Sequence, residues 1–210
     1  MYAALQIRKS LSRFHEKQVK YIWNDLSPET KQAVKQGLFI LLEQTPDKAT
    51  RSSIADAIGD IGGALYDENA KVGVDPFHEW PEIPNNIFKL IVSDKKELIE
   101  SGFMILSQIL TYTADGFLKY KEQLKERFKF FLTNNNLTDL QLGAMQSLGS
   151  MLEVLDPDDC KFFEELCIEV LKAAYNIVMN DENSVWFDFF ALFHFWHFFT
   201  VIEFCLNLKF

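Results

Sequence analysis

The sequence predicts an all-α protein made of helical hairpins, and three observations support this prediction. Apolar residues recur at steps of three and four along most of the chain, which is the spacing of one helix face. The six prolines, all between residues 28 and 157, separate these amphipathic stretches from one another. No segment shows the sustained alternation of apolar and polar residues that is typical of a strand.

The first hairpin is predicted to pair helices 28–44 and 48–66. Ser27 suits the N-cap of the first helix, Pro28 suits its first helical position, and Glu29 places an acid in its first turn. Thr45-Pro46-Asp47 forms a turn that ends this helix and begins the next. The apolar stripes of the two helices are Ala33, Val34, Gly37, Leu38, Leu41 and Leu42, and then Ile54, Ala57, Ile58, Ile61 and Leu65.

Two further hairpins are predicted, pairing 84–93 with 95–113 and 117–132 with 138–155. Their turns are Ser93-Asp94 and Asn134-Asn135-Asn136. Each second helix carries a small residue followed by apolar residues three, four or seven positions later; these small residues are Ala55, Gly102 and Ala144, which lie 47 and 42 residues apart. Helical hairpins with a period of about 40–47 residues are typical of HEAT and armadillo repeats. We therefore expect an α-α superhelix, a HEAT/armadillo-like solenoid of about four repeats that bury their apolar faces by stacking.

The charge balance favours protein partners over nucleic acid. The chain has 21 Lys and Arg against 30 Asp and Glu, a net charge of -9, whereas binding to phosphates needs a basic surface. Acidic proteins are suited to basic partners. The three cysteines, Cys160, Cys167 and Cys205, do not form a disulfide framework and fit a reducing compartment.

Motifs that carry catalysis are not found in the sequence. It has no Gly-x-Ser-x-Gly, no phosphate-binding Gly-rich loop and no His-Glu-x-x-His. Gly59-Asp60-Ile61-Gly62-Gly63 lies within a helical stripe and is interpreted as a packing or helix-ending feature. His194 and His197 stand three residues apart but have no Cys, Asp or Glu at ligand spacing. We expect no enzyme, no cofactor and no metal.

Several short segments form an ordered series along the chain. They are a helix-like stretch from Ala3 to Leu11, the stretch from Trp23 to Gln36 with Leu26-Ser27-Pro28-Glu29, Lys35 with Leu41-Leu42, Arg51-Ser-Ser-Ile-Ala55-Asp56-Ala-Ile58, and Trp80-Pro81-Glu82. In order and spacing this series resembles the N-terminal HEAT-repeat region of importin-β (karyopherin-β) nuclear transport receptors. It is most similar to the long branch that carries ribosomal proteins and histones, and the resemblance covers about residues 3–182.

The resemblance implies a non-catalytic function in nucleocytoplasmic transport. Such receptors bind Ran-GTP through inner helices of their N-terminal repeats, basic protein cargo on the concave face, and phenylalanine-glycine nucleoporins on the outer face. It implies a location in cytoplasm, nucleus and nuclear pore, and a fragment without the receptor's first repeat and its later ones. The alternative is another HEAT-repeat scaffold that binds proteins without Ran.

Asp56 and Asp60 are the candidate protein-binding residues. They are four residues apart on the predicted helix 48–66 and therefore share one face, while Ile54, Ile58 and Ile61 lie on the other side. Second helices line the concave surface of HEAT arrays, so these carboxylates would face cargo or Ran; the alternative is an ordinary solvated helix face. Asp156, Asp158 and Asp159 flank Pro157 and are interpreted as a helix start instead.

The last part of the chain departs from this pattern. Residues 187–210 contain nine of the 20 phenylalanines. The domain division predicted is therefore a solenoid fragment over 1–183 and an anomalous apolar tail over 184–210. Three explanations remain open: sequence foreign to the family after Asn183, which we favour, a capping helix, or a membrane anchor. An anchor is disfavoured because the longest uncharged run, from Phe189 to Ile202, has 14 residues where a span needs about 20.

Overall fold

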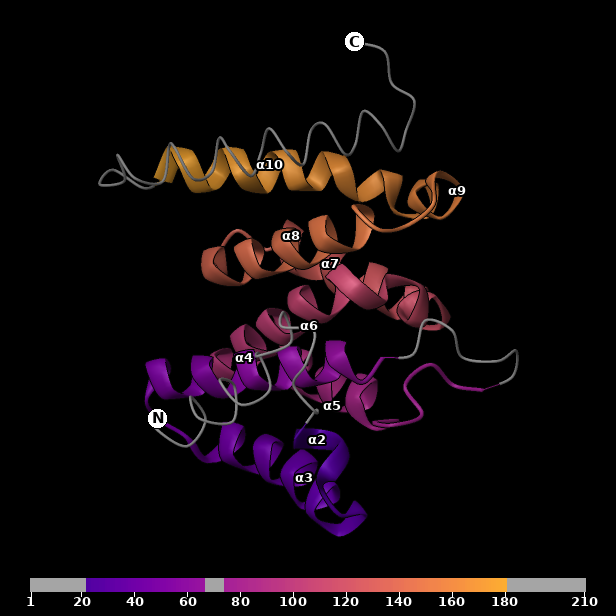
Figure 1. Cartoon of the computed structure of the whole chain (residues 1–210). Coiled ribbons are helices and arrows are strands. Elements are labelled where there is room, and N and C mark those ends of the chain that lie inside the picture. The colour runs from indigo at the N-terminus through magenta and orange to yellow at the C-terminus, as the bar shows by residue number, and fades with distance from the viewer. Residues whose placement is uncertain (1–21, 67–73, 181–210) are drawn as a thin grey trace. The chain divides into compact units, whose positions relative to one another are not determined.

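The computed structural model describes residues 22–66 and 74–180, and every regular element within them is a helix (Figure 1). The chain divides into two compact units, Met1–Gly116 and Phe117–Phe210, which are treated separately below. The predicted all-α class is confirmed. The predicted tail, 184–210, lies outside the described residues.

The first hairpin of unit 1 follows its prediction closely. A short helix, α2 (Ile22–Asp25), leads into α3 (Pro28–Gln44) and α4 (Lys48–Ala64), which pack on each other. The Ser27 Oγ accepts a hydrogen bond from the Thr30 backbone N–H at 3.3 Å, so the predicted N-cap is confirmed. At the other turn, the Asp47 Oδ2 caps α4 by accepting from the Thr50 N–H at 2.8 Å.

The second hairpin consists of α5 (Ile83–Ile91) and α6 (Lys96–Phe117). The second helix is predicted to end at residue 113, and its regular geometry is interrupted there, although the element continues to Phe117. Thr113 has φ -139° and ψ 24°, and its hydroxyl donates to the Ile109 carbonyl at 2.7 Å, so α6 bends there and continues for another turn. A 3₁₀ turn, η2 (Leu118–Tyr120), follows, and α7 therefore begins at Lys121 rather than at the predicted residue 117.

The second helices of unit 1, α4 and α6, lie side by side and run in the same direction. Lys48 pairs with Glu100 at 3.6 Å, Asp56 contacts Gln108, and Gly63 lies against Tyr112, so the partners advance together along both helices. This parallel stacking of equivalent helices is the arrangement expected of consecutive repeats.

Two glycines permit the close contact between these helices. A Cβ on Gly59 would meet the Gln108 side chain, and one on Gly62 would meet Ile83 and, at 2.8 Å, Ile109 Cδ1. The interpretation of this glycine segment as a packing or helix-ending feature is confirmed, since α4 also ends at Ala64, directly after Gly63. Gly102 plays the same part within the second hairpin, because a Cβ there would lie 2.9 Å from the Leu90 Cβ.

Unit 2 contains α7 (Lys121–Thr133), α8 (Thr138–Leu152), α9 (Pro157–Cys160), η3 (Lys161–Phe163) and α10 (Glu164–Asn180). Helices α7 and α8 form a hairpin, and α10 packs against both. Asp156 is the residue before α9, with Pro157 at its first position, so the predicted helix start is confirmed. The core residues of the unit include Leu124, Phe128, Leu140, Ala144, Leu148, Phe163, Leu166 and Val170.

Candidate functional site

The two predicted site residues, Asp56 and Asp60, lie one turn apart on α4 and are both half-buried. Asp56 is also engaged within the fold, because its Oδ1 accepts a hydrogen bond from the Gln108 Nε2 of α6 at 2.7 Å. This contact fixes the orientation of the Asp56 carboxylate and ties α4 to α6.

Gln108 and Tyr112 extend this feature onto the neighbouring helix. Tyr112 is 72% exposed and lies against Gly63, while the Gln108 Oε1 is buried without a hydrogen-bond partner among the residues that the structure describes. We call Asp56, Asp60, Gln108 and Tyr112 the α4–α6 surface. Its carboxylates and exposed ring are groups that bind cationic side chains, by ion pairing and by cation–π contact.

Gln108 and Tyr112 were missed by the sequence analysis. Both are polar or amphipathic residues four positions apart, off the apolar stripe of the predicted helix 95–113, and this spacing is the signal that could have found them.

Three residues of the family-like series make contacts with or from α3 inside unit 1: Trp23, Lys35 and Trp80. The Lys35 ammonium lies over the buried Trp23 ring, 5.8 Å from its centroid, and donates a hydrogen bond to the Glu79 main-chain carbonyl. Phe39, one turn further along α3, packs edge-on against Trp80 with ring centroids 5.8 Å apart. Burial lowers the pKa of Lys35 despite the nearby carboxylates of Glu79 and Glu82, which act in the opposite direction.

Arg51, a fourth residue of that series, has a similar internal role. It is only 5% exposed, and its Nη1 donates to the carbonyls of Thr45 and Pro46, each at 3.2 Å. It thereby closes the turn between α3 and α4. These family-like residues hold the repeats together rather than forming an exposed site.

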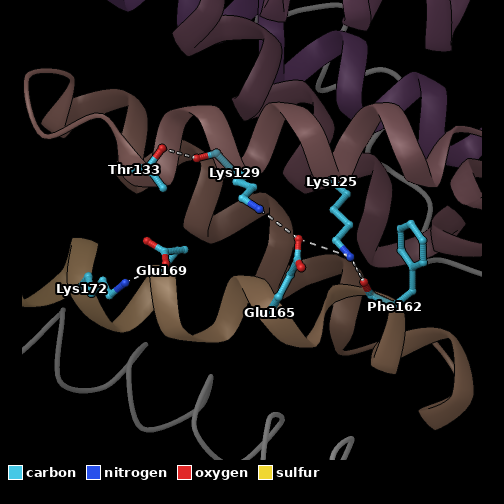
Figure 2. Close-up of polar contacts among 7 residues, drawn as sticks. All are labelled: Lys125, Lys129, Thr133, Phe162, Glu165, Glu169 and Lys172. Atoms are coloured by element: carbon cyan, nitrogen blue, oxygen red, sulfur yellow. Dashed lines mark hydrogen bonds and ion pairs between the residues drawn. The ribbon is translucent and has the colours of Figure 1, made fainter.

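In unit 2, charged side chains join α7 to α10, as Figure 2 shows. Glu165 of α10 pairs with Lys125 at 3.5 Å and with Lys129 at 3.3 Å, and these lysines lower the pKa of its carboxyl through the Lys129 hydrogen bond and through their charge. Lys121 reaches Asp159 at 4.0 Å. The sequence analysis missed this row, although the four-residue spacing of the three lysines would have indicated one helix face.

Comparison with known families gives a match over residues 46–193 to the model of the family described as IPO5-like, TPR repeats. The chain belongs to the IPO5-like repeat family. The match covers every helix from α4 to α10, and the resemblance to the N-terminal repeats of importin-β receptors is confirmed. No curated protein matches the chain.

The candidate metal and thiol residues of this IPO5-like chain lie only partly within the described residues. Residues 22–66 and 74–180 contain no group of three or more His, Cys, Asp or Glu placed to hold a metal. Cys160 and Cys167 are buried thiols, whereas Cys205 and the pair His194 and His197 lie outside the described residues. None of the described helices is both long and apolar enough to cross a membrane.

Proposed function

We propose that this chain is an importin-like repeat fragment that binds basic protein cargo and Ran-GTP in nucleocytoplasmic transport. The observation that carries the proposal is the IPO5-like family match over residues 46–193. The chain would act by binding rather than by catalysis, in cytoplasm and nucleus, and would meet phenylalanine-glycine nucleoporins at the nuclear pore.

Two physical features support basic partners. The net charge of -9 attracts cationic proteins over distances of about a Debye length, which is about 8–10 Å at physiological salt. The α4–α6 surface adds short-range groups, since Asp56 and Asp60 can pair with Lys or Arg while Tyr112 presents an exposed ring beside them.

A second candidate is a repeat scaffold that binds proteins without Ran. It stays open because of one observation: Trp23, Lys35, Arg51 and Trp80 are all used inside the fold. These residues therefore indicate stacked repeats and do not show whether the chain binds Ran.

The deciding experiment measures binding of the full chain to Ran loaded with GTP and with GDP, and to a Lys/Arg-rich peptide. The transport proposal expects preference for the GTP form and binding of the peptide. Peptide binding without any preference for Ran-GTP would favour the scaffold, and binding of neither would refute both.

Variants measured in the same experiment test whether the α4–α6 surface is the binding site. Asp56→Asn with Asp60→Asn is expected to weaken peptide binding about tenfold or more, because two charge pairs are lost. The matched control is Asp94→Asn with Glu97→Gln, which removes two exposed carboxylates from the turn before α6 and from its first turn and should leave binding unchanged. Equal effects of the two changes would mean that overall charge, and not this surface, attracts the peptide.

A further inference from the structure

Two lysines in different units make the same unusual contact. Lys35 of α3 donates its ammonium hydrogen bond to the main-chain carbonyl of Glu79, and Lys125 of α7 donates to the main-chain carbonyl of Phe162 at 2.7 Å. Each acceptor lies shortly before a helix that follows the lysine's own hairpin: Glu79 precedes α5, and Phe162 precedes α10.

The surroundings of the two contacts also correspond. Both ammonium groups lie over an aromatic ring, Lys35 at 5.8 Å from the centroid of Trp23 and Lys125 at 4.5 Å from that of Phe162. The residue after each acceptor is a buried aromatic, Trp80 in one case and Phe163 in the other. The two rings come from different parts of the repeat. Trp23 lies before α3, the helix that carries Lys35, whereas Phe162 lies after the hairpin that carries Lys125.

Lys35 and Lys125 are less exposed than the neighbouring lysines on the same helices. Lys35 is 7% exposed and the Lys125 side chain 22%, whereas Lys129, one turn along α7, is 56% exposed. Withdrawing an ammonium group from water is costly unless it is hydrogen-bonded, so the buried Lys35 depends on its carbonyl acceptor; the half-buried Lys125 depends on its acceptor together with Glu165.

We propose that Lys35 and Lys125 are equivalent inter-repeat staples, each of which fixes the start of the next repeat's first helix and thereby the way consecutive repeats stack. An ammonium group has three donors, so a staple can bind the carbonyl while keeping a second partner, as Lys125 does with Glu165 (Figure 2). The role is one of positioning, and it is independent of which partners the repeats bind.

Amide hydrogen exchange of the full chain tests the staples. Lys35→Met keeps the length and apolar character of the stem but removes the donor. Exchange over residues 75–91 should become about tenfold faster, because a charge-assisted hydrogen bond is lost, while α4 and residues 157–177 keep their rates. Lys125→Met should show the reverse, with faster exchange over 157–177 alone.

The controls remove a lysine one turn away. Lys31 lies over the same Trp23 ring at 6.0 Å, and Lys129 pairs with the same Glu165, but neither donates to the acceptor carbonyls. Lys31→Met and Lys129→Met should therefore leave exchange near the wild-type rates. Equal effects of control and staple variants would overturn the proposal, because the ring contact or the ion pair would then account for the result.

Two conservative variants test the proposal if the methionine variants do not fold. Lys35→Arg and Lys125→Arg keep a cationic donor. They should retain most of the protection in 75–91 and 157–177; exchange throughout the unit as fast as in an unfolded chain would reject a role for the hydrogen bond.

Discussion

At the scale of single residues, the side chains that define the hairpins act mainly on backbone carbonyls and amides. Ser27 and Asp47 cap helices, and Arg51 closes a turn by donating to two carbonyls. Such contacts satisfy backbone groups that the helix ends leave without partners. A substitution at one of these positions therefore affects a whole turn.

Arg51 provides the clearest residue-scale prediction. Arg51→Met should lower the free energy of unfolding by about 2 kcal/mol, because two hydrogen bonds from a buried cation are lost. Urea denaturation followed by circular dichroism measures this change. Lys48→Met on the same helix, whose side chain is exposed, should change it by about 0.5 kcal/mol or less; comparable losses in both variants would refute the role of Arg51.

At the scale of elements, the contact between α4 and α6 depends on the small size of Gly59 and Gly62. Removing a Cβ from one helix lets a neighbouring side chain lie directly on its backbone, so the two axes can approach. Gly62 faces Ile83 and Ile109, which are themselves buried and have little room to move.

Gly62→Ala should accordingly destabilise the protein by about 1–3 kcal/mol through overpacking, even though alanine favours the helix. Gly37→Ala is the matched substitution in α3, where a Cβ would meet nothing within 4 Å. It should stabilise by about 0.5–1 kcal/mol. Thermal melts of both variants would contradict this account if the two midpoints moved in the same direction.

The charged row between α7 and α10 has a definite pH dependence. Lys129 and Lys125 lower the pKa of Glu165 in the folded protein, so its contribution to stability is present above the unfolded value near 4.5 and is lost as the pH falls through the lower folded value. Glu165→Gln should reduce stability at neutral pH and weaken the loss of stability below about pH 4.5.

The measurement for this prediction is urea denaturation of the wild type and Glu165→Gln between neutral and acid pH. Glu126→Gln, on the exposed side of α7, is the control and should follow the wild-type curve. Parallel curves for the wild type and Glu165→Gln at every pH would show that the ion pairs contribute nothing.

At the scale of the whole molecule, the net charge is the property that can be read most directly from the sequence. A chain of net charge -9 should bind a Lys/Arg-rich peptide more weakly as salt rises, by about tenfold or more between about 0.1 M and 0.5 M. Fluorescence anisotropy of a labelled peptide provides the measurement. Affinity that does not change with salt would indicate an apolar interface instead of an electrostatic one.

The elements of the fold were predictable where their causes are local. Ser27-Pro28 and Thr45-Pro46-Asp47 mark helix ends by their own chemistry, and both were predicted correctly. The break at Thr113 coincides with the predicted helix end, whereas the further turn to Phe117 beyond the bend was not predicted.

The candidate site was less predictable, since its contacts join distant residues. The spacing of Asp56 and Asp60 predicted that they share one face of α4. The Asp56–Gln108 hydrogen bond, however, spans 52 residues of sequence, and the Lys35–Glu79 contact spans 44. Nothing in the local pattern around Lys35 distinguishes a buried lysine from a solvated one. Such pairs emerge only when the repeats are stacked.

The carbonyl acceptors of Lys35 and Lys125 have a consequence for how such a chain can evolve. One acceptor belongs to a glutamate and the other to a phenylalanine, two side chains that share no chemistry. A carbonyl is supplied by any amino acid, so mutation at either position leaves the acceptor in place. Repeats joined in this way can diverge in sequence and still fit together.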